Sequence, residues 1–152
     1  MQWIFVFVIA VAAILTGCSP SLSTRRDGQA ENAVSREHSI ERLVEIVRND
    51  PSKKALLAKE VMGGDVLVIP DPGAKSLALV MFNQPERSFI PVFSSRAIFD
   101  EEAYGTGFDG KAITIDAKRF ASLLDPDDLV ILNPGHRPAI EFKASELKAL
   151  AR

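Results

Sequence analysis

Four short, mostly apolar runs constrain the fold of this chain more than any other feature. They have four to six residues each and end at proline, serine or asparagine. The runs are Asp65–Pro70, Leu77–Phe82, Phe89–Phe93 and Leu129–Leu132. Runs of this length and composition are typical of strands that are buried on both faces of a sheet. The sequence therefore predicts a sheet with helices packed against it.

Two further short strands are expected, at Lys111–Ile115 and Ala139–Phe142. Proline has no N–H group to donate to a neighbouring strand. Because Pro91 interrupts the run Phe89–Phe93, we expect that strand to lie at a sheet edge or to carry a bulge there.

Helical patterns alternate with these strands. The first is expected to begin at Ser39 as N-cap and to end at Asn49-Asp50-Pro51, since proline disfavours a helical residue before it. The second is expected over Ser52–Met62, buried through Leu56, Leu57 and Val61, with Gly63-Gly64 after it. The others are expected after Ser94-Ser95, after the Asp116 cap, and over Ser145–Leu150. We predict an α+β fold: a mixed β-sheet covered by helices in a single domain.

The N-terminus indicates where the protein is located. Every residue of Trp3–Leu15 is apolar, a run too short for a permanent membrane span but typical of a signal peptide. Leu15-Thr16-Gly17-Cys18 follows and is similar to a bacterial lipobox, whose cysteine thiol receives the lipid. No Lys or Arg precedes Cys18, which departs from the usual pattern. The alternative is that Cys18 is a small apolar residue ending a buried helix.

Lipidation would leave residues 18–152 as the mature protein, attached to a membrane through acyl chains such as palmitate. Cys18 is the chain's single cysteine, so no disulfide can form within one chain. Residues 18–38 are polar and predict a flexible tether, followed by a domain over 39–152. Ser19 directly after the cysteine favours the outer membrane of a bacterial cell envelope.

Charge excludes one class of partner. The chain has 18 Lys and Arg residues against 20 Asp and Glu residues, a formal net charge of −2. A nucleic-acid-binding domain would carry a basic stripe, so we expect no nucleic acid partner. The sequence also indicates no cofactor. The partners we expect are the membrane, reached through the lipid, and a protein or small molecule.

The order of the motifs resembles the SseB N-terminal domain family. Ile90-Pro91-Val92-Phe93-Ser94-Ser95 enters a short helix, and Leu129-Val130-Ile131-Leu132 ends in Asn133-Pro134-Gly135. The opening helix from Ile40 and the pair Leu56-Leu57 are also placed as in that family. The resemblance covers about Ser39 to Leu150 and implies no particular reaction. It suggests a cytosolic protein with a second domain, and the leader and the short chain depart from both.

Two segments are candidates for a site. Asn133, Gly135 and His136 could present backbone N–H groups and a titratable ring to a ligand or partner. The alternative is a hairpin turn in which Asn133 and Gly135 supply hydrogen bonds and positive φ. Ser94, Ser95 and Arg96 could hold an anion, or simply cap a helix. If both strand ends lie at one edge of the sheet, the six residues could form one pocket.

Other patterns fail on their context. Gly105–Gly110 leads into a strand and not a helix, so we expect a surface loop and no phosphate site. His38 and His136 lack a second metal ligand at suitable spacing, and Asp125, Asp127 and Asp128 lack a calcium-loop pattern. No nucleophile elbow supports a Ser–His–Asp set. We expect a lipid-anchored interaction or ligand-binding module and no enzyme; the alternative is an enzyme acting on a small anionic metabolite.

Overall fold

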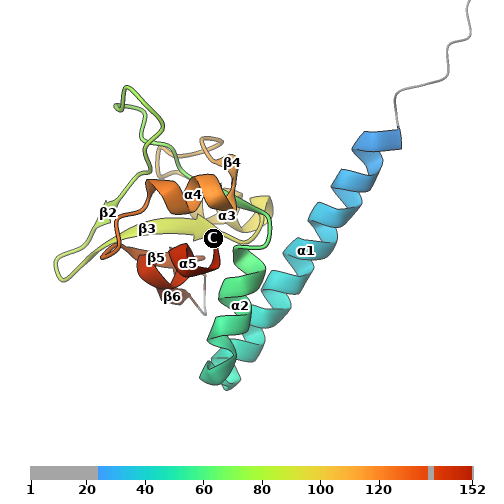
Figure 1. The fold of residues 1–152 in the computed structure, drawn as a ribbon. Helices are drawn as coiled ribbons and strands as arrows, with labels where there is room; N and C mark the ends of the chain where they lie inside the picture. The colour runs from blue at the N-terminus through green and yellow to red at the C-terminus, as the bar shows by residue number, and fades with distance from the viewer. Residues whose placement is uncertain (1–23, 137–138, 152) are drawn as a thin grey trace, which may run out of the picture.

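A mixed sheet of six strands organises the chain (Figure 1). The computed structural model describes residues 24–136 and 139–151. The strands are β1 (Asp65–Val68), β2 (Phe82–Asn83), β3 (Ser88–Phe93), β4 (Ile113–Asp116), β5 (Leu129–Leu132) and β6 (Ile140–Lys143). Their order is β4-β1-β3-β5-β6, and β2 also pairs with β3. Of the strand pairs, only β3 and β5 run parallel. Their carboxyl ends therefore lie side by side along one edge of the sheet, the edge that runs across the ends of the strands.

We expected the strand containing Pro91 to lie at an edge or to carry a bulge, and the edge position is wrong, because β3 is central. It pairs with β5 on one side, and with β1 and β2 on the other. The Val92 carbonyl accepts from Asn133 N–H, so Val92 faces β5 and its neighbour Pro91 faces the opposite side. On that side β2 pairs with Ser88 and Phe89, and β1 pairs with Val92 and Phe93. Pro91, which has no N–H, therefore lies between the two paired segments.

Helices cover both faces of the sheet. They are α1 (Thr24–Asn49), α2 (Lys54–Val61), α3 (Arg96–Ala103), α4 (Ala117–Leu123) and α5 (Ala144–Leu150), with a 3₁₀ turn at Pro51–Lys53. One core cluster joins Val66, Val68 and Val92 to α2, α4, α5 and the later part of α1. Another joins Leu67 and Phe93 to α3. Alternate strand residues thus enter different cores, so the expected α+β fold is confirmed.

The opening helix differs from its prediction. Helix α1 begins at Thr24 and not near Ser39, so residues 24–38, which we assigned to a flexible tether, are helical. Nothing between Thr24 and Asn49 stops a helix: the segment has no proline and one glycine. Figure 1 shows the N-terminal half of α1 leading away from the sheet. The predicted signal peptide and Cys18 lie outside the described residues.

Helix α2 corrects two further expectations. Ser52, the predicted cap of this helix, lies inside the preceding 3₁₀ turn, whose own cap is Asp50: the Asp50 carboxylate accepts from the Ser52 N–H at 3.1 Å. The N-cap of α2 is Lys53, which makes no side-chain capping hydrogen bond. Leu56 is 51% exposed, whereas Leu57, Ala58 and Val61 are buried. Residues three and four apart share one side of a helix, and Leu57 and Val61 are four apart. Leu56 precedes Leu57 by one residue and therefore lies on a different side.

The run Leu77–Phe82 does not form the buried strand that we predicted. It contributes one isolated bridge, between Pro70 and Leu79, and then the short strand β2. Residues 77–80 are only half-buried and Met81 is exposed. Figure 1 shows this segment in an arm that projects from the sheet, where less of the protein is available to cover it.

None of the helices within residues 24–136 and 139–151 is long and apolar enough to cross a bilayer.

Candidate functional site

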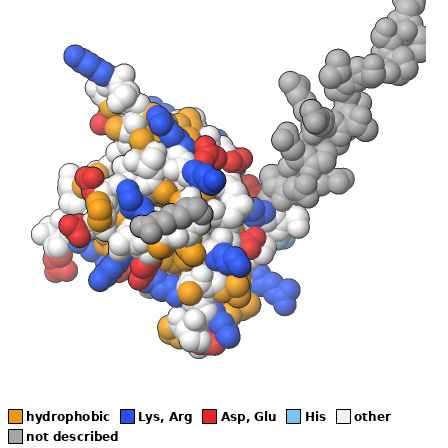
Figure 2. Space-filling model, viewed as in Figure 1, with side chains coloured by type: hydrophobic (Ala, Val, Ile, Leu, Met, Phe, Trp, Pro, Cys, Tyr) orange, Lys and Arg blue, Asp and Glu red, His pale blue; other side chains and the backbone are white. Residues whose placement is uncertain are grey.

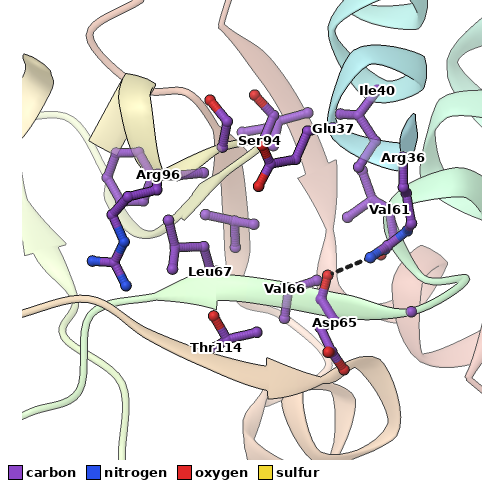
Figure 3. A pocket seen from close by; sticks show the side chains of 15 residues that line it. Arg36, Glu37, Ile40, Val61, Asp65, Val66, Leu67, Ser94, Arg96 and Thr114 are labelled. Atoms are coloured by element: carbon purple, nitrogen blue, oxygen red, sulfur yellow. Dashed lines mark hydrogen bonds between the residues drawn. The ribbon is translucent and has the colours of Figure 1, made fainter. Parts of the chain in front are cut away.

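A cavity of about 500 Å³ lies at the edge of the sheet where β3 and β5 end. Its walls come from α1, the start of β1, β4, and the turn from β3 into α3 (Figure 3). Its polar and charged lining residues are Arg36, Glu37, Asp65, Ser94, Ser95, Arg96 and Thr114. Its apolar ones include Ile40, Val66, Leu67, Val92, Phe93 and Leu132. This volume is within the range of small-molecule sites, and the edge at which parallel strands end is a common place for them.

Asn133 joins the two strand ends beside this cavity. Its side-chain carbonyl accepts from Ser94 N–H at 2.9 Å, and its amide donates to Ser94 Oγ at 3.0 Å. Its backbone N–H donates to the Val92 carbonyl at 2.8 Å. Asn133 is 1% exposed and has a φ of 54°, a left-handed conformation that asparagine tolerates well. The two predicted segments therefore do lie together, and Asn133 links them structurally.

Ser94, Ser95 and Arg96 line the cavity, as the composite-pocket hypothesis requires. Ser95 is the N-cap of α3, since its hydroxyl accepts from the Ile98 N–H at 3.3 Å. The exposed Arg96 donates to the Ala112 carbonyl at 3.1 Å, and its guanidinium carbon lies 5.5 Å from the centre of the Phe99 ring. Helix capping thus accounts for Ser95 without a ligand, and binding by these residues stays a prediction.

Asn133, Gly135 and His136 are not among the residues that line the cavity, although Asn133 lies directly after the lining residue Leu132. The backbone of Gly135 lies against the Glu102 carboxylate of α3, which a Cβ at this position would overlap. Asn133 supplies the positive φ of the turn, and Gly135 has no positive φ, so that part of our hairpin interpretation is corrected. His136 is half-buried just before residues 137–138, which lie outside the described part of the chain.

Arg36 is a contribution from α1 that we missed by assigning it to the tether. Its guanidinium donates to the carbonyls of Glu60 at 3.1 Å, Val61 at 2.7 Å and Asp65 at 2.7 Å. The Glu60 and Val61 carbonyls belong to the C-terminal turn of α2, where a cation is favoured, and the Asp65 carbonyl belongs to the start of β1. A Cβ on Gly64 would lie 2.7 Å from Arg36 Nη1, so glycine permits this close approach. We call this set of contacts the Arg36 clamp.

One sequence signal could have found Arg36. The buried residues of α1 are Ile40, Val44 and Val47, and Arg36 precedes Ile40 by one helical turn. It therefore continues the same face of the helix toward the N-terminus. Glu37 is its neighbour along the chain and also lines the cavity.

The glycine loop and the aspartate turn have structural roles. Asp109 accepts from Gly105 N–H at 3.0 Å within an exposed loop in which three glycines have positive φ. The backbone N–H groups of Gly105, of Asp109 itself and of Gly107 hold the pKa of the Asp109 carboxyl below its ordinary value. Asp128 accepts from Asp125 N–H at 2.7 Å and so closes a turn. In the described part of the chain, no three His, Cys, Asp or Glu residues are grouped so that they could hold a metal ion.

Charges of both signs are mixed on one face of the molecule. Figure 2 shows basic and acidic side chains interspersed over the face that carries α4 and α5, together with small apolar areas. The fold and the cavity together describe the class of protein. It is an α+β protein with a cavity where two parallel strands end, and a long helix forms one wall of that cavity.

The chain belongs to the SseB protein N-terminal domain family, whose model matches residues 40–149. The match begins within α1 and ends within α5, so it spans the whole sheet. Comparison with curated proteins and with solved structures gave no significant match.

Proposed function

We propose that this protein is a lipid-anchored module of the bacterial cell envelope whose SseB N-terminal domain binds a ligand or a partner in the cavity beside α1. The anchor is Cys18, in the lipobox-like Leu15-Thr16-Gly17-Cys18. Ser19 favours the outer membrane. Each buried methylene of an acyl chain contributes about 0.8 kcal/mol, so two or three chains hold a protein firmly.

Helix α1 supports this proposal, because it links the proposed anchor to the cavity. Thr24 follows Cys18 by six residues, and the helix over 24–35 spans about 18 Å at 1.5 Å per residue. The Arg36 clamp then fixes the helix to α2 and β1, and Glu37 and Ile40 on the same helix line the cavity. The connection between membrane and domain is thus in large part a helical stalk.

The observation that carries the binding role is the composition of the cavity wall. Apolar side chains of β1 and β3 lie beside a few hydroxyl and charged groups, as in small-molecule sites. Thr114→Trp tests it, because Thr114 is exposed on β4 and a large ring there would fill the cavity without removing a buried contact. We expect any compound that raises the melting temperature of the full-length protein in detergent to lose that effect in Thr114→Trp and keep it in Thr114→Ser.

Cys18→Ala tests the anchor. We expect the variant to incorporate no labelled palmitate and to remain unprocessed, because no other residue can form the thioether. Equal labelling of the wild type and the variant would contradict the proposal. Density-gradient fractions of the two membranes then test the outer-membrane assignment.

An enzyme acting on a small anionic metabolite remains the second candidate, and the presence of Arg96 at the cavity favours it. Binding without reaction is better supported. Ser94 Oγ already accepts from Asn133, Ser95 Oγ caps α3, and His136 does not line the cavity. Turnover of an anionic metabolite that is lost in Arg96→Gln would favour the enzyme.

A further inference from the structure

Among the charged residues that line the cavity, Glu37 is half-buried and its side chain lacks a protein partner within the described part of the chain. It is half-buried on α1, and Figure 3 shows its side chain directed from the helix into the space above β1. Within the part of the chain that the structure describes, its carboxylate has no hydrogen-bond or salt-bridge partner. A half-buried carboxylate depends on water for its solvation, so an occupant that displaces this water must replace it.

The other charges at the cavity are already solvated or engaged. The Arg36 guanidinium already donates to three backbone carbonyls. Arg96 is exposed, donates to Ala112 and lies across the cavity from Glu37 (Figure 3). Asp65 is also exposed. Water can continue to hydrate Arg96 and Asp65 when the cavity is filled, which leaves Glu37 as the charge that the occupant must match.

The surface next to Glu37 is apolar. Leu67 of β1 and Val92 and Phe93 of β3 are buried residues that line the cavity, and Ser94 adds one hydroxyl group. An alkyl chain can pack on these side chains, whereas a strongly hydrated cation would gain nothing from them.

We propose that the cavity binds a primary ammonium group on a short alkyl stem, with Glu37 as its anionic partner. This proposal rests on the ligand-binding role proposed above and gives it a chemical class. The ammonium group would donate to the Glu37 carboxylate while the stem covers Leu67 and Phe93. A free alkylamine and the lysine side chain of a partner both present this chemistry.

The test uses the full-length protein in detergent micelles, with amide NMR signals as the readout. The probes are n-butylammonium, Nα-acetyl-lysine N-methylamide and butyrate, which has the opposite charge. We expect saturable shifts at Leu67 and Ser94 with the ammonium probes and none with butyrate. Glu37→Gln should weaken ammonium binding about tenfold or more, because a partly desolvated charge pair is lost.

Glu41→Gln is the matched control, because Glu41 is half-buried on the same helix but does not line the cavity. Binding should be unchanged in this variant, and thermal melts should show that both variants are folded. Binding of butylammonium alone would indicate a free amine, whereas binding of the lysine probe as well would allow a partner's side chain.

Three results would overturn the proposal: no saturable shift with either ammonium probe, unchanged affinity in Glu37→Gln, or equal weakening in Glu41→Gln. Saturable binding of butyrate in their place would keep the binding role and reject the ligand class. The binding role itself fails separately, if stabilising compounds act equally on Thr114→Trp.

Discussion

Two polar junctions border the cavity, and they differ in burial. Asn133 and Ser94 join β3 to β5 inside the protein, at 1% and 7% exposure. The Arg36 clamp joins α1 to α2 and β1, and its guanidinium is only half-buried. Both use hydrogen bonds to backbone groups, but groups left unpaired at the first junction cannot reach water. Changes at the first junction should therefore lower the free energy of unfolding more than changes at the second.

Leu132→Ala and Asn133→Ala should have the two largest effects, and Leu132→Ala acts by removing apolar packing directly before Asn133. Leu132 is 1% exposed and belongs to the main core cluster. We expect the free energy of unfolding to fall by about 2–5 kcal/mol, measured by urea denaturation. Leu56→Ala is the matched control, since Leu56 is 51% exposed. Its effect should be about 0.5 kcal/mol or less. Equal losses in the two variants would contradict the assigned burial.

Asn133→Ala tests the buried junction itself. The variant leaves the Ser94 N–H without its partner, which costs about 1–3 kcal/mol, and places alanine at positive φ, which costs about 1–2 kcal/mol more. Asn133→Gly separates the two terms, because glycine accepts this φ and also lacks the side chain. If Asn133→Gly is as stable as the wild type, the hydrogen bonds to Ser94 contribute nothing.

Arg36→Ala should lower stability less than the two changes above, but it should change the position of α1 more. We expect a loss of about 1–2 kcal/mol, since charge-assisted hydrogen bonds are lost but water can reach the released carbonyls. Hydrogen exchange should quicken in the early part of α1. Spin labels on α1 and β6 should give a broader distance distribution. Arg42→Ala, which changes an exposed arginine of the same helix, should leave both measurements unchanged.

The loop around Asp109 is a third polar junction, and it is fully exposed. We expect it to contribute the least of the three to the free energy of unfolding. Backbone N–H groups, first that of Gly105, lower the pKa of Asp109 from about 3.8. A lowered pKa gives a stability contribution that is present above the unfolded-state pKa and is lost as pH falls through the folded-state pKa. Carboxyl NMR titration should therefore give Asp109 a pKa below the ordinary aspartate value of about 3.8. A higher value at Asp109 would contradict the loop geometry.

Local signals in the sequence predicted much of the fold. The caps Ser95 and Asp116, the strand Leu129–Leu132 and its returning partner all lie where we expected them. Each depends on side chains within a few residues, such as a hydroxyl or carboxylate that accepts from the first turn of its own helix. The order of motifs also indicated the family, which the match over residues 40–149 shows.

The candidate site was only partly predictable. Ser94, Ser95 and Arg96 line the cavity, but Asn133, Gly135 and His136 do not, and Arg36 and Glu37 were missed. Which of these residues line the cavity does not depend on their neighbours in the sequence. Whether a strand end faces a cavity depends on its neighbours in the sheet, and β3 and β5 are separated by a strand and two helices in the sequence.

What the sequence determined by itself was the α+β class, the strand Leu129–Leu132 and the helix caps Ser95 and Asp116, because periodicity and short motifs are properties of neighbouring residues. Only the tertiary structure decided the rest. It placed Pro91 where two partner strands meet, gave the positive φ to Asn133 and brought Arg36 to the carbonyls of α2. These features arise from contacts between distant segments, whose energies depend on which groups are buried together and not on their spacing along the chain.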